Sequence, residues 1–176
     1  YPKRSLRAQL CVAGNAMLRS YAASHDIPFK MVGTLIVATS EDAAAALEAI
    51  LQHGRENGVT GLMVVDRARV RSLEPQLRCI TALHSTNTGV IDSHALMLCL
   101  QADLEANGGV TVFHSPILGG AVSEAGITLD IGGSSPIQIR ARSLIVATGL
   151  GACPLARAIG LPDVPEERRC KGNYFT

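Results

Sequence analysis

The amino-acid sequence predicts a mixed α/β (α+β) fold, in which alternating strands and helices give way to a run of short strands. The apolar segments 33–39 and 61–66 are each followed by a helical pattern. After Gly109 the apolar residues alternate in part, as in a β-meander. The meander leads into 143–151, an apolar run ending in glycine that is typical of a strand buried on both faces. A core strand followed by an ordinary turn is the alternative interpretation of that run.

The composition excludes two classes of protein. With 176 residues, 47% apolar and 18% charged, the chain is long enough to bury a core. A net charge of +1 without a basic stripe, together with three Phe, three Tyr and no Trp, argues against nucleic-acid binding. No apolar run approaches the roughly 18 residues of a membrane span, so no transmembrane segment is expected.

The cysteines and histidines favour neither a disulfide framework nor a metal site. The five cysteines are odd in number, widely separated and free of any Cys-x-x-Cys pair, which favours reduced thiols. We therefore expect a reducing intracellular compartment, whether cytoplasmic, membrane-peripheral or mitochondrial. The five histidines show no metal-ligand spacing with one another or with cysteine.

The first helix is expected over residues 5–24, with Ser5 as its cap. Arg7 and Arg19 would lie near its two ends, where a solvated face is the simplest interpretation. One stripe of this helix is predicted to face a core, because its apolar residues are spaced at helical intervals: Leu6, Leu10, Met17 and Tyr21.

Two strand–helix pairs follow. The segment 33–39 is expected to be a strand, and the pair Thr39-Ser40 caps a helix that ends at Asn57. The segment 61–66 is expected to be the next strand, with Asp66 capping a short helix. Residues 79–85 form a further predicted strand, and 86–92 a polar loop. Asp92 or Ser93 then caps a helix that ends at the turn 107–109.

The last third of the chain is predicted to contain mostly strands. Pro154 opens a helix of about two turns, and 161–167 forms an extended connection. The last residues of the segment 168–176 could begin a further strand. The expected strands are 110–114, 117–122, 126–131, 137–140 and 144–149.

Four stretches carry a resemblance to a known family: Tyr1-Pro-x-x-Ser-Leu-Arg-Ala-x-Leu-Cys11, Glu74-Pro75, Thr88-Gly-Val-Ile-Asp-Ser93 and Cys170-Lys-Gly-Asn-Tyr-Phe175. In this order, with the meander and Ile-Val-Ala-Thr-Gly between them, they resemble FAD-dependent oxidoreductases of the D-amino-acid oxidase type. Within that superfamily they are most similar to the L-2-hydroxyglutarate oxidase or dehydrogenase group. The resemblance covers essentially the whole chain.

The resemblance implies a portion of a Rossmann-like FAD-binding domain with a β-meander, interleaved with a mixed-sheet substrate domain. Residues 1–86 would belong to the substrate domain and 87–160 to the middle of the FAD-binding domain. Residues 161–176 would return to the substrate domain.

The resemblance also implies site residues. Ile117 would lie against the adenine of FAD, while Ala147, Thr148 and Gly149 would line the bend near its phosphates and ribityl chain. A glycine suits that bend, because a Cβ would keep the backbone from a close approach. The residues expected to contact substrate are Tyr1, Arg7, Lys171 and Tyr174. For Arg7 and Lys171 simple solvation is an equal alternative, as packing in a sheet is for Tyr174.

The sequence departs from the family pattern in two ways. The Gly-x-Gly-x-x-Gly turn that holds the pyrophosphate is absent, so we expect the chain to be an internal portion of a flavoenzyme. Arg7 stands where the family usually has lysine, which keeps the charge but alters the hydrogen-bond geometry.

The implied reaction is hydride transfer from C2 of a small 2-hydroxy acid to flavin. Neither the catalytic base nor the electron acceptor can be assigned from the residues. Two alternatives remain at this point: a non-catalytic fragment that does not hold FAD by itself, and an autonomous α/β nucleotide-binding module.

Overall fold

The protein is described by a computed structural model that covers residues 1–172. The chain divides into two compact units, residues 1–109 and residues from 110 onward. This division reflects only which residues contact one another, and it does not test which residues bind substrate or cofactor. The boundaries 86/87 and 160/161 between substrate-domain and FAD-domain portions therefore stay predictions.

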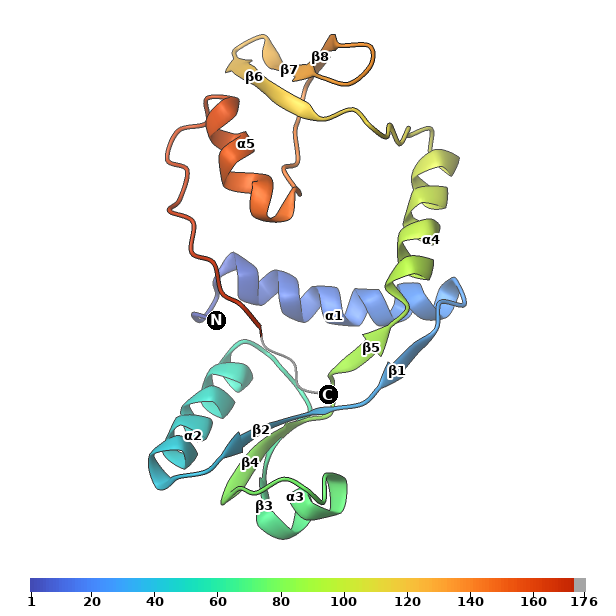
Figure 1. The fold of residues 1–176 in the computed structure, drawn as a ribbon. Coiled ribbons are helices and arrows are strands. Elements are labelled where there is room, and N and C mark those ends of the chain that lie inside the picture. Colours follow the sequence, from blue (N-terminus) through green and yellow to red (C-terminus); the bar gives the residue numbers. More distant parts are fainter. Residues whose placement is uncertain (173–176) are drawn as a thin grey trace. The chain divides into compact units, whose positions relative to one another are not determined.

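The first unit is organised around a three-stranded antiparallel sheet with the order β2-β4-β3 (Figure 1). Its strands are β2 (Thr34–Ala38), β3 (Leu62–Asp66) and β4 (Thr81–Ser85). Ile36 and Val64 lie opposite Leu83 of the central strand. These bounds confirm the three predicted strands to within two residues at their ends.

Two helices pack on this sheet. Because successive side chains of a strand point to opposite faces, Ala82 and Leu83 belong to different cores. Leu83 packs with Ala38 and with two leucines of α2 (Glu41–Glu56). Ala82 packs with Val65 and with Val70 of α3 (Arg67–Leu73).

The predicted helix caps are present. Ser40 Oγ accepts a hydrogen bond from the backbone N–H of Ala43 at 3.3 Å, and Asp66 Oδ1 accepts one from Arg69 at 2.8 Å. Asn57 ends α2, and Gly58 follows with φ +79°, a left-handed conformation that favours glycine. Local sequence therefore sets the start and end of these helices.

The first helix, α1 (Leu6–Ser24), begins as predicted, since Ser5 Oγ accepts from the Ala8 N–H at 3.2 Å. Its predicted orientation is wrong. Leu6 and Met17 are each 70% exposed, whereas Ala8 and Ala22 are buried. The helix packs through its small and polar side, so the apolar stripe does not face the core of this unit.

A two-stranded ribbon joins the sheet region to α4. It pairs β1 (Phe29–Met31) with β5 (Gly89–Ile91). The loop predicted over 86–92 is thus wrong for 89–91, because Phe29–Met31 supplies a hydrogen-bonding partner that the local pattern does not reveal. The next helix, α4 (Ser93–Ala106), is capped by Asp92, whose Oδ1 accepts from the Ala95 N–H at 2.9 Å.

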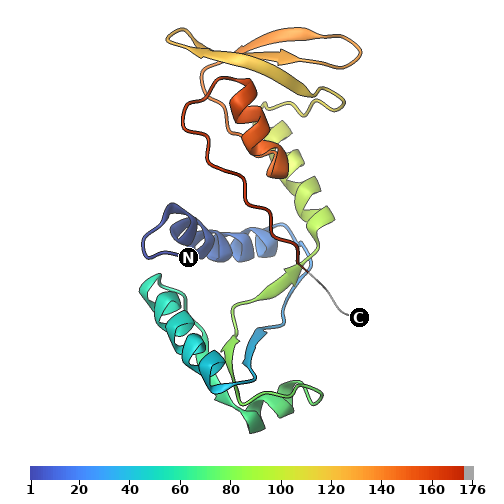
Figure 2. The same cartoon turned by 60° about the vertical axis from the view of Figure 1, so that its left-hand side comes forward.

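The second unit contains the predicted β-meander, with neighbouring strands paired antiparallel in chain order. A short 3-10 turn, η1 (Gly149–Gly151), leads into α5 (Ala152–Ala158), which packs beside β6 in both views (Figure 1 and Figure 2). Residues 161–172 form neither helix nor strand, as expected for the extended connection over 161–167. The last residues, 173–176, where a further strand could begin, lie outside the described part of the chain. The meander strands are β6 (Ile117–Ser123), β7 (Gly126–Ile131) and β8 (Ile137–Ala141).

Two predicted strands of this unit do not form. Residues 110–114 and 144–149 have an extended sequence pattern but form no strand, and Gly149 begins a 3-10 turn instead. A strand needs hydrogen bonds from a neighbouring strand, and within the described part of the chain neither segment has one. Val112 is 66% and Ile145 90% exposed, so the predicted burial of 143–151 is also wrong in this structure.

Candidate functional site

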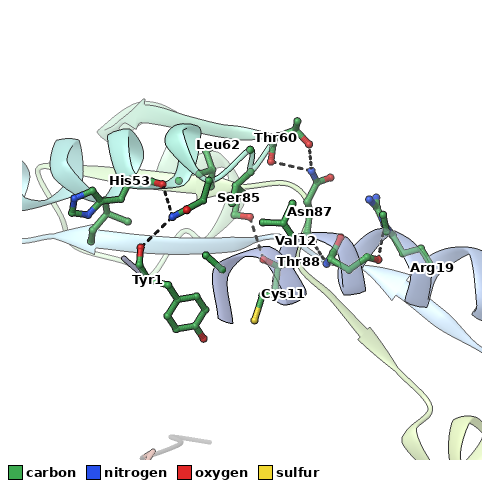
Figure 3. A pocket seen from close by; sticks show the side chains of 18 residues that line it. Tyr1, Cys11, Val12, Arg19, His53, Thr60, Leu62, Ser85, Asn87 and Thr88 are labelled. Atoms are coloured by element: carbon green, nitrogen blue, oxygen red, sulfur yellow. Dashed lines mark hydrogen bonds between the residues drawn. The ribbon is translucent and has the colours of Figure 1, made fainter. Parts of the chain in front are cut away.

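The first unit has a pocket of about 600 Å³ between α1 and α2 (Figure 3). Its walls come from one side of α1, from the second half of α2 with the following turn, and from the end of β4 with its loop. Ala8, Val12, Ile50, Val59 and Leu62 give it an apolar lining. Its volume falls in the range typical of small-molecule sites.

The loop after β4 is held by hydrogen bonds from distant parts of the chain. Asn87 Nδ2 donates to the carbonyl and hydroxyl oxygens of Thr60, at 2.9 and 2.8 Å. Asn15 Nδ2 of α1 donates to the Asn87 carbonyl at 3.2 Å. The backbone N–H groups of Val32 and Gly33 donate to the Thr88 carbonyl. These bonds fix the polar edge of the pocket relative to α1.

The first residues of the chain are fastened to the end of α2 by Asn57. Its Nδ2 donates to the Tyr1 carbonyl at 3.1 Å, and its Oδ1 accepts from the Arg4 N–H at 3.2 Å. Lys3 Nζ also lies 3.7 Å from Glu56 Oε2. A hydrogen bond from Gln52, followed by the charge of Lys3, lowers the pKa of Glu56. Tyr1 is thereby placed at the edge of the pocket.

The charge of the pocket wall is one-sided. Arg19 and His53 line it, and no Asp or Glu does. Arg19 Nε donates to the Asn15 carbonyl at 3.4 Å, so the guanidinium is held by one nitrogen. Figure 3 shows Arg19 and His53 toward different ends of the pocket.

A second cluster of titratable groups joins α1 to α4, outside this pocket. The Tyr21 hydroxyl donates to Asp103 Oδ2 at 2.7 Å, and His25 Nε2 lies 3.3 Å from the same oxygen. The rings of Tyr21 and His25 stack with their centroids 4.0 Å apart. The hydrogen bond to Asp103, assisted by desolvation and by the negative charge, raises the pKa of Tyr21 to about 12.

We expect the Tyr21 hydroxyl to lose its proton at a higher pH than an ordinary tyrosine. A pKa raised from 10.0 to about 12 means that the native state favours the protonated phenol. Its stabilising effect is complete below pH 10.0 and is lost as the pH rises through about 12. Ultraviolet absorbance of tyrosinate during an alkaline titration measures this. Tyr21→Phe should remove the latest step, and Asp103→Asn should move it to lower pH; a latest step that survives in Tyr21→Phe would contradict the assignment.

The structure brings together two of the four predicted substrate residues. The Arg7 guanidinium carbon lies 5.3 Å from the centre of the Tyr1 ring, a cation–π distance. Both side chains are exposed. Lys171 is exposed near the end of the extended segment of the second unit, and Tyr174 lies outside the described residues.

The predicted cofactor residues lie in the second unit. Ile117 is the first residue of β6, half-buried opposite Ile131. Ala147, Thr148 and Gly149 are exposed. Gly149 has φ +56°, and no atom lies within 4 Å of the place where a Cβ would stand. This open, left-handed glycine fits the close backbone approach that a bound cofactor group requires.

Sequence reasoning missed the residues that build the pocket. Asn57 was expected only to end a helix and Asn87 only to form a loop, yet both bond to residues far away in sequence. Asparagine is common in both settings, so nothing in the local pattern distinguished them. Within residues 1–172, no three His, Cys, Asp or Glu side chains are grouped to hold a metal ion. No helix there is both long and apolar enough to cross a bilayer.

Comparison with known proteins defines the class. The family described as "DAO: FAD dependent oxidoreductase" matches residues 1–176, and the chain belongs to this family. It is similar to proteins named "L-2-hydroxyglutarate dehydrogenase, mitochondrial". The one from Arabidopsis thaliana is 30% identical over all of this chain and 43% of that protein. The human one is 27% identical over 99% of this chain and 40% of that protein. The predicted resemblance is confirmed.

Solved structures agree on the fold. L-proline dehydrogenase from P. horikoshii matches 91% of this chain and 42% of its own with a TM-score of 0.75 at 14% identity. L-alpha-glycerophosphate oxidase from Mycoplasma pneumoniae, solved with FAD bound, matches 89% and 42% with a TM-score of 0.74 at 20% identity. The chain thus has a mixed α/β fold shared with part of these enzymes, and it spans about two fifths of the curated relatives described above.

Proposed function

We propose that this chain is an internal portion of an FAD-dependent oxidoreductase that oxidises a 2-hydroxy acid, with L-2-hydroxyglutarate as the substrate. The observation that carries the proposal is the family match over all 176 residues, together with relatives that bear this enzyme's name. These relatives are named as mitochondrial proteins, which supports a mitochondrial or other reducing intracellular compartment for the complete protein. Within residues 1–172, the apolar residues Leu6 and Met17 of α1 are exposed and the segments 110–114 and 143–148 pair with no strand, as expected if further protein surface covers them in the complete enzyme.

In this proposal each unit carries candidate residues of its own. Ile117 and the turn 147–149 would hold part of FAD, which when bound supplies the acceptor for the hydride from C2. Arg7, positioned over Tyr1, would bind a substrate carboxylate through charge-assisted hydrogen bonds. Lys171 and Tyr174 are further candidates for substrate contact. The proposed boundaries remain 1–86, 87–160 and 161–176.

A spectroscopic experiment tests the proposal. The full-length protein that contains this chain should be yellow, and anaerobic addition of L-2-hydroxyglutarate should bleach the flavin absorbance. A matched addition of D-2-hydroxyglutarate controls for the stereochemistry. A colourless protein, or a flavin that stays oxidised with the L isomer, would overturn the assignment.

The second candidate concerns the 176 residues taken alone. The absence of a Gly-x-Gly-x-x-Gly turn favours a chain that does not hold FAD by itself. A ligand that binds only the native state raises the melting temperature. An unchanged melting temperature of the 176-residue chain in the presence of FAD would therefore support this candidate. Bleaching of the flavin in the full-length protein would separately test the proposed oxidoreductase activity.

A further inference from the structure

Two asparagines end helices of the first unit in the same local way. Asn57 follows α2 and Asn107 follows α4, and a glycine in the left-handed conformation comes after each of them. The side-chain Nδ2 donates to the carbonyl four residues earlier, at 3.0 Å for Asn57 and at 2.7 Å for Asn107. Capping the helix therefore accounts for one N–H of each side-chain amide.

Asn57 makes two further hydrogen bonds, which Asn107 does not make within residues 1–172. Its Nδ2 also donates to the Tyr1 carbonyl at 3.1 Å, and its Oδ1 accepts from the Arg4 N–H at 3.2 Å. These partners lie 56 and 53 residues earlier in the chain. The Asn57 amide thus binds both ends of the segment 1–4, through a donor at one end and an acceptor at the other.

The segment bound in this way leads directly into the predicted substrate residues. Arg4 has φ +58°, an uncommon left-handed conformation for a residue other than glycine. The Ser5 N–H donates to the Pro2 carbonyl at 3.1 Å, so the segment is a tight turn. Arg7 lies in the first turn of α1 immediately afterwards, with its guanidinium carbon 5.3 Å from the centre of the Tyr1 ring.

The bonds of Asn57 fix this turn without covering the side chains that it presents. An uncommon backbone conformation, as at Arg4, persists only where its surroundings hold it. Asn57 bonds to backbone groups alone, and the side chains of Tyr1 and Arg7 stay exposed. The donors of the Arg7 guanidinium are therefore oriented by the turn and are not consumed by it.

We propose that Asn57 is a positioning residue of the substrate site: by binding residues 1–4 to the end of α2, it sets the position of Arg7. This inference rests on the proposed function, because only there is Arg7 a substrate residue. Asn57 acts through Arg7 and does not contact the substrate itself.

A double-mutant cycle on the full-length protein, with L-2-hydroxyglutarate, tests the proposal. Asn57→Ala should lower kcat/KM by about five-fold, mainly through a higher KM, because Arg7 loses its fixed position. In an Arg7→Met background the same substitution should change kcat/KM by less than about two-fold. An equal loss in both backgrounds is the result of a merely structural role, and it would overturn the proposal.

Asn107→Ala is the matched control, because it removes the same kind of helix cap without removing a bond to residues 1–4. It should leave kcat/KM unchanged, and an equal loss in Asn57→Ala and Asn107→Ala would also overturn the proposal. If Asn57→Ala does not fold or does not retain flavin, Asn57→Asp takes its place in the cycle. Aspartate keeps the acceptor for the Arg4 N–H and loses the Nδ2 donor.

Hydrogen exchange separates this inference from the proposed function, because it does not depend on activity. The Arg4 N–H should exchange faster in Asn57→Ala, while the Ala8 N–H, which donates to Ser5 Oγ, should exchange at its original rate. An unchanged rate at Arg4 would overturn the role of Asn57 alone. A full-length protein whose flavin is not bleached by L-2-hydroxyglutarate would instead overturn the proposed function, and the positioning role with it.

Discussion

On the proposed function, replacing Arg7 by methionine in the full-length protein is expected to lower kcat/KM for L-2-hydroxyglutarate by about ten-fold or more. The Arg7 guanidinium is exposed and held over the Tyr1 ring, so its donors are available to a substrate carboxylate. Methionine retains the apolar length of the side chain and removes the charge. If Arg7 binds the substrate and the transition state equally, the change will lie in KM. Steady-state kinetics measures both constants.

Two further variants show whether a loss of kcat/KM comes from the charge at position 7. Arg7→Lys should recover most of the lost kcat/KM, because the resemblance puts lysine at this position in the family. Arg67→Met, at an exposed position on α3, should leave the kinetics unchanged. Unaltered kcat/KM in Arg7→Met would remove Arg7 from the substrate site.

Leu83→Ala is expected to destabilise the first unit by about 3 kcal/mol. Leu83 is 1% exposed at the centre of the sheet, where it packs with Ala38, Leu47 and Leu51. The substitution removes buried methyl groups and leaves a cavity that the antiparallel strands on both sides of β4 prevent from closing. Urea unfolding followed by circular dichroism measures the loss.

The matched control is Leu104→Ala on α4. Leu104 is 46% exposed, and alanine is the strongest helix former, so this change should cost less than about 1 kcal/mol. A cost at Leu83 no larger than that at Leu104 would show that the core of β4 does not stabilise the unit.

The fold was predicted best where the cause is local. Ser5, Ser40, Asp66 and Asp92 each cap the helix that follows, because their side-chain oxygens reach a backbone N–H three residues further on. The meander was predicted for a similar reason, since short turns fix the pairing of neighbouring strands.

The failures have a common physical origin in partners that are distant in sequence. The ribbon β1-β5 joins Phe29 to Ile91, and no local pattern specifies that pairing. The run 143–148 has the composition of a buried strand, but composition does not supply the neighbour that makes a strand. In α1 the helical spacing of the apolar residues predicted a buried stripe, but spacing alone does not supply a surface against which that stripe can pack.

The candidate site, too, was predicted where the residues are close in sequence and missed where they are distant. Tyr1 and Arg7 lie six positions apart and were expected together, and a contact between them is present. The pocket depends on Asn15, Asn57 and Asn87, whose bonds join segments more than 25 residues apart in the chain. Such bonds follow from the tertiary fold, so a single sequence does not reveal them.

Small side chains keep the space between α1 and α2 open. Ala16 of α1 faces it with a single methyl group, and its side chain is exposed. Leucine at this position would fill part of that volume with apolar atoms and would gain packing energy for the unit. A pocket that can hold a small molecule therefore lowers the conformational stability that denser packing would give at this place in the fold. A version of the unit selected only for heat resistance would be expected to close it.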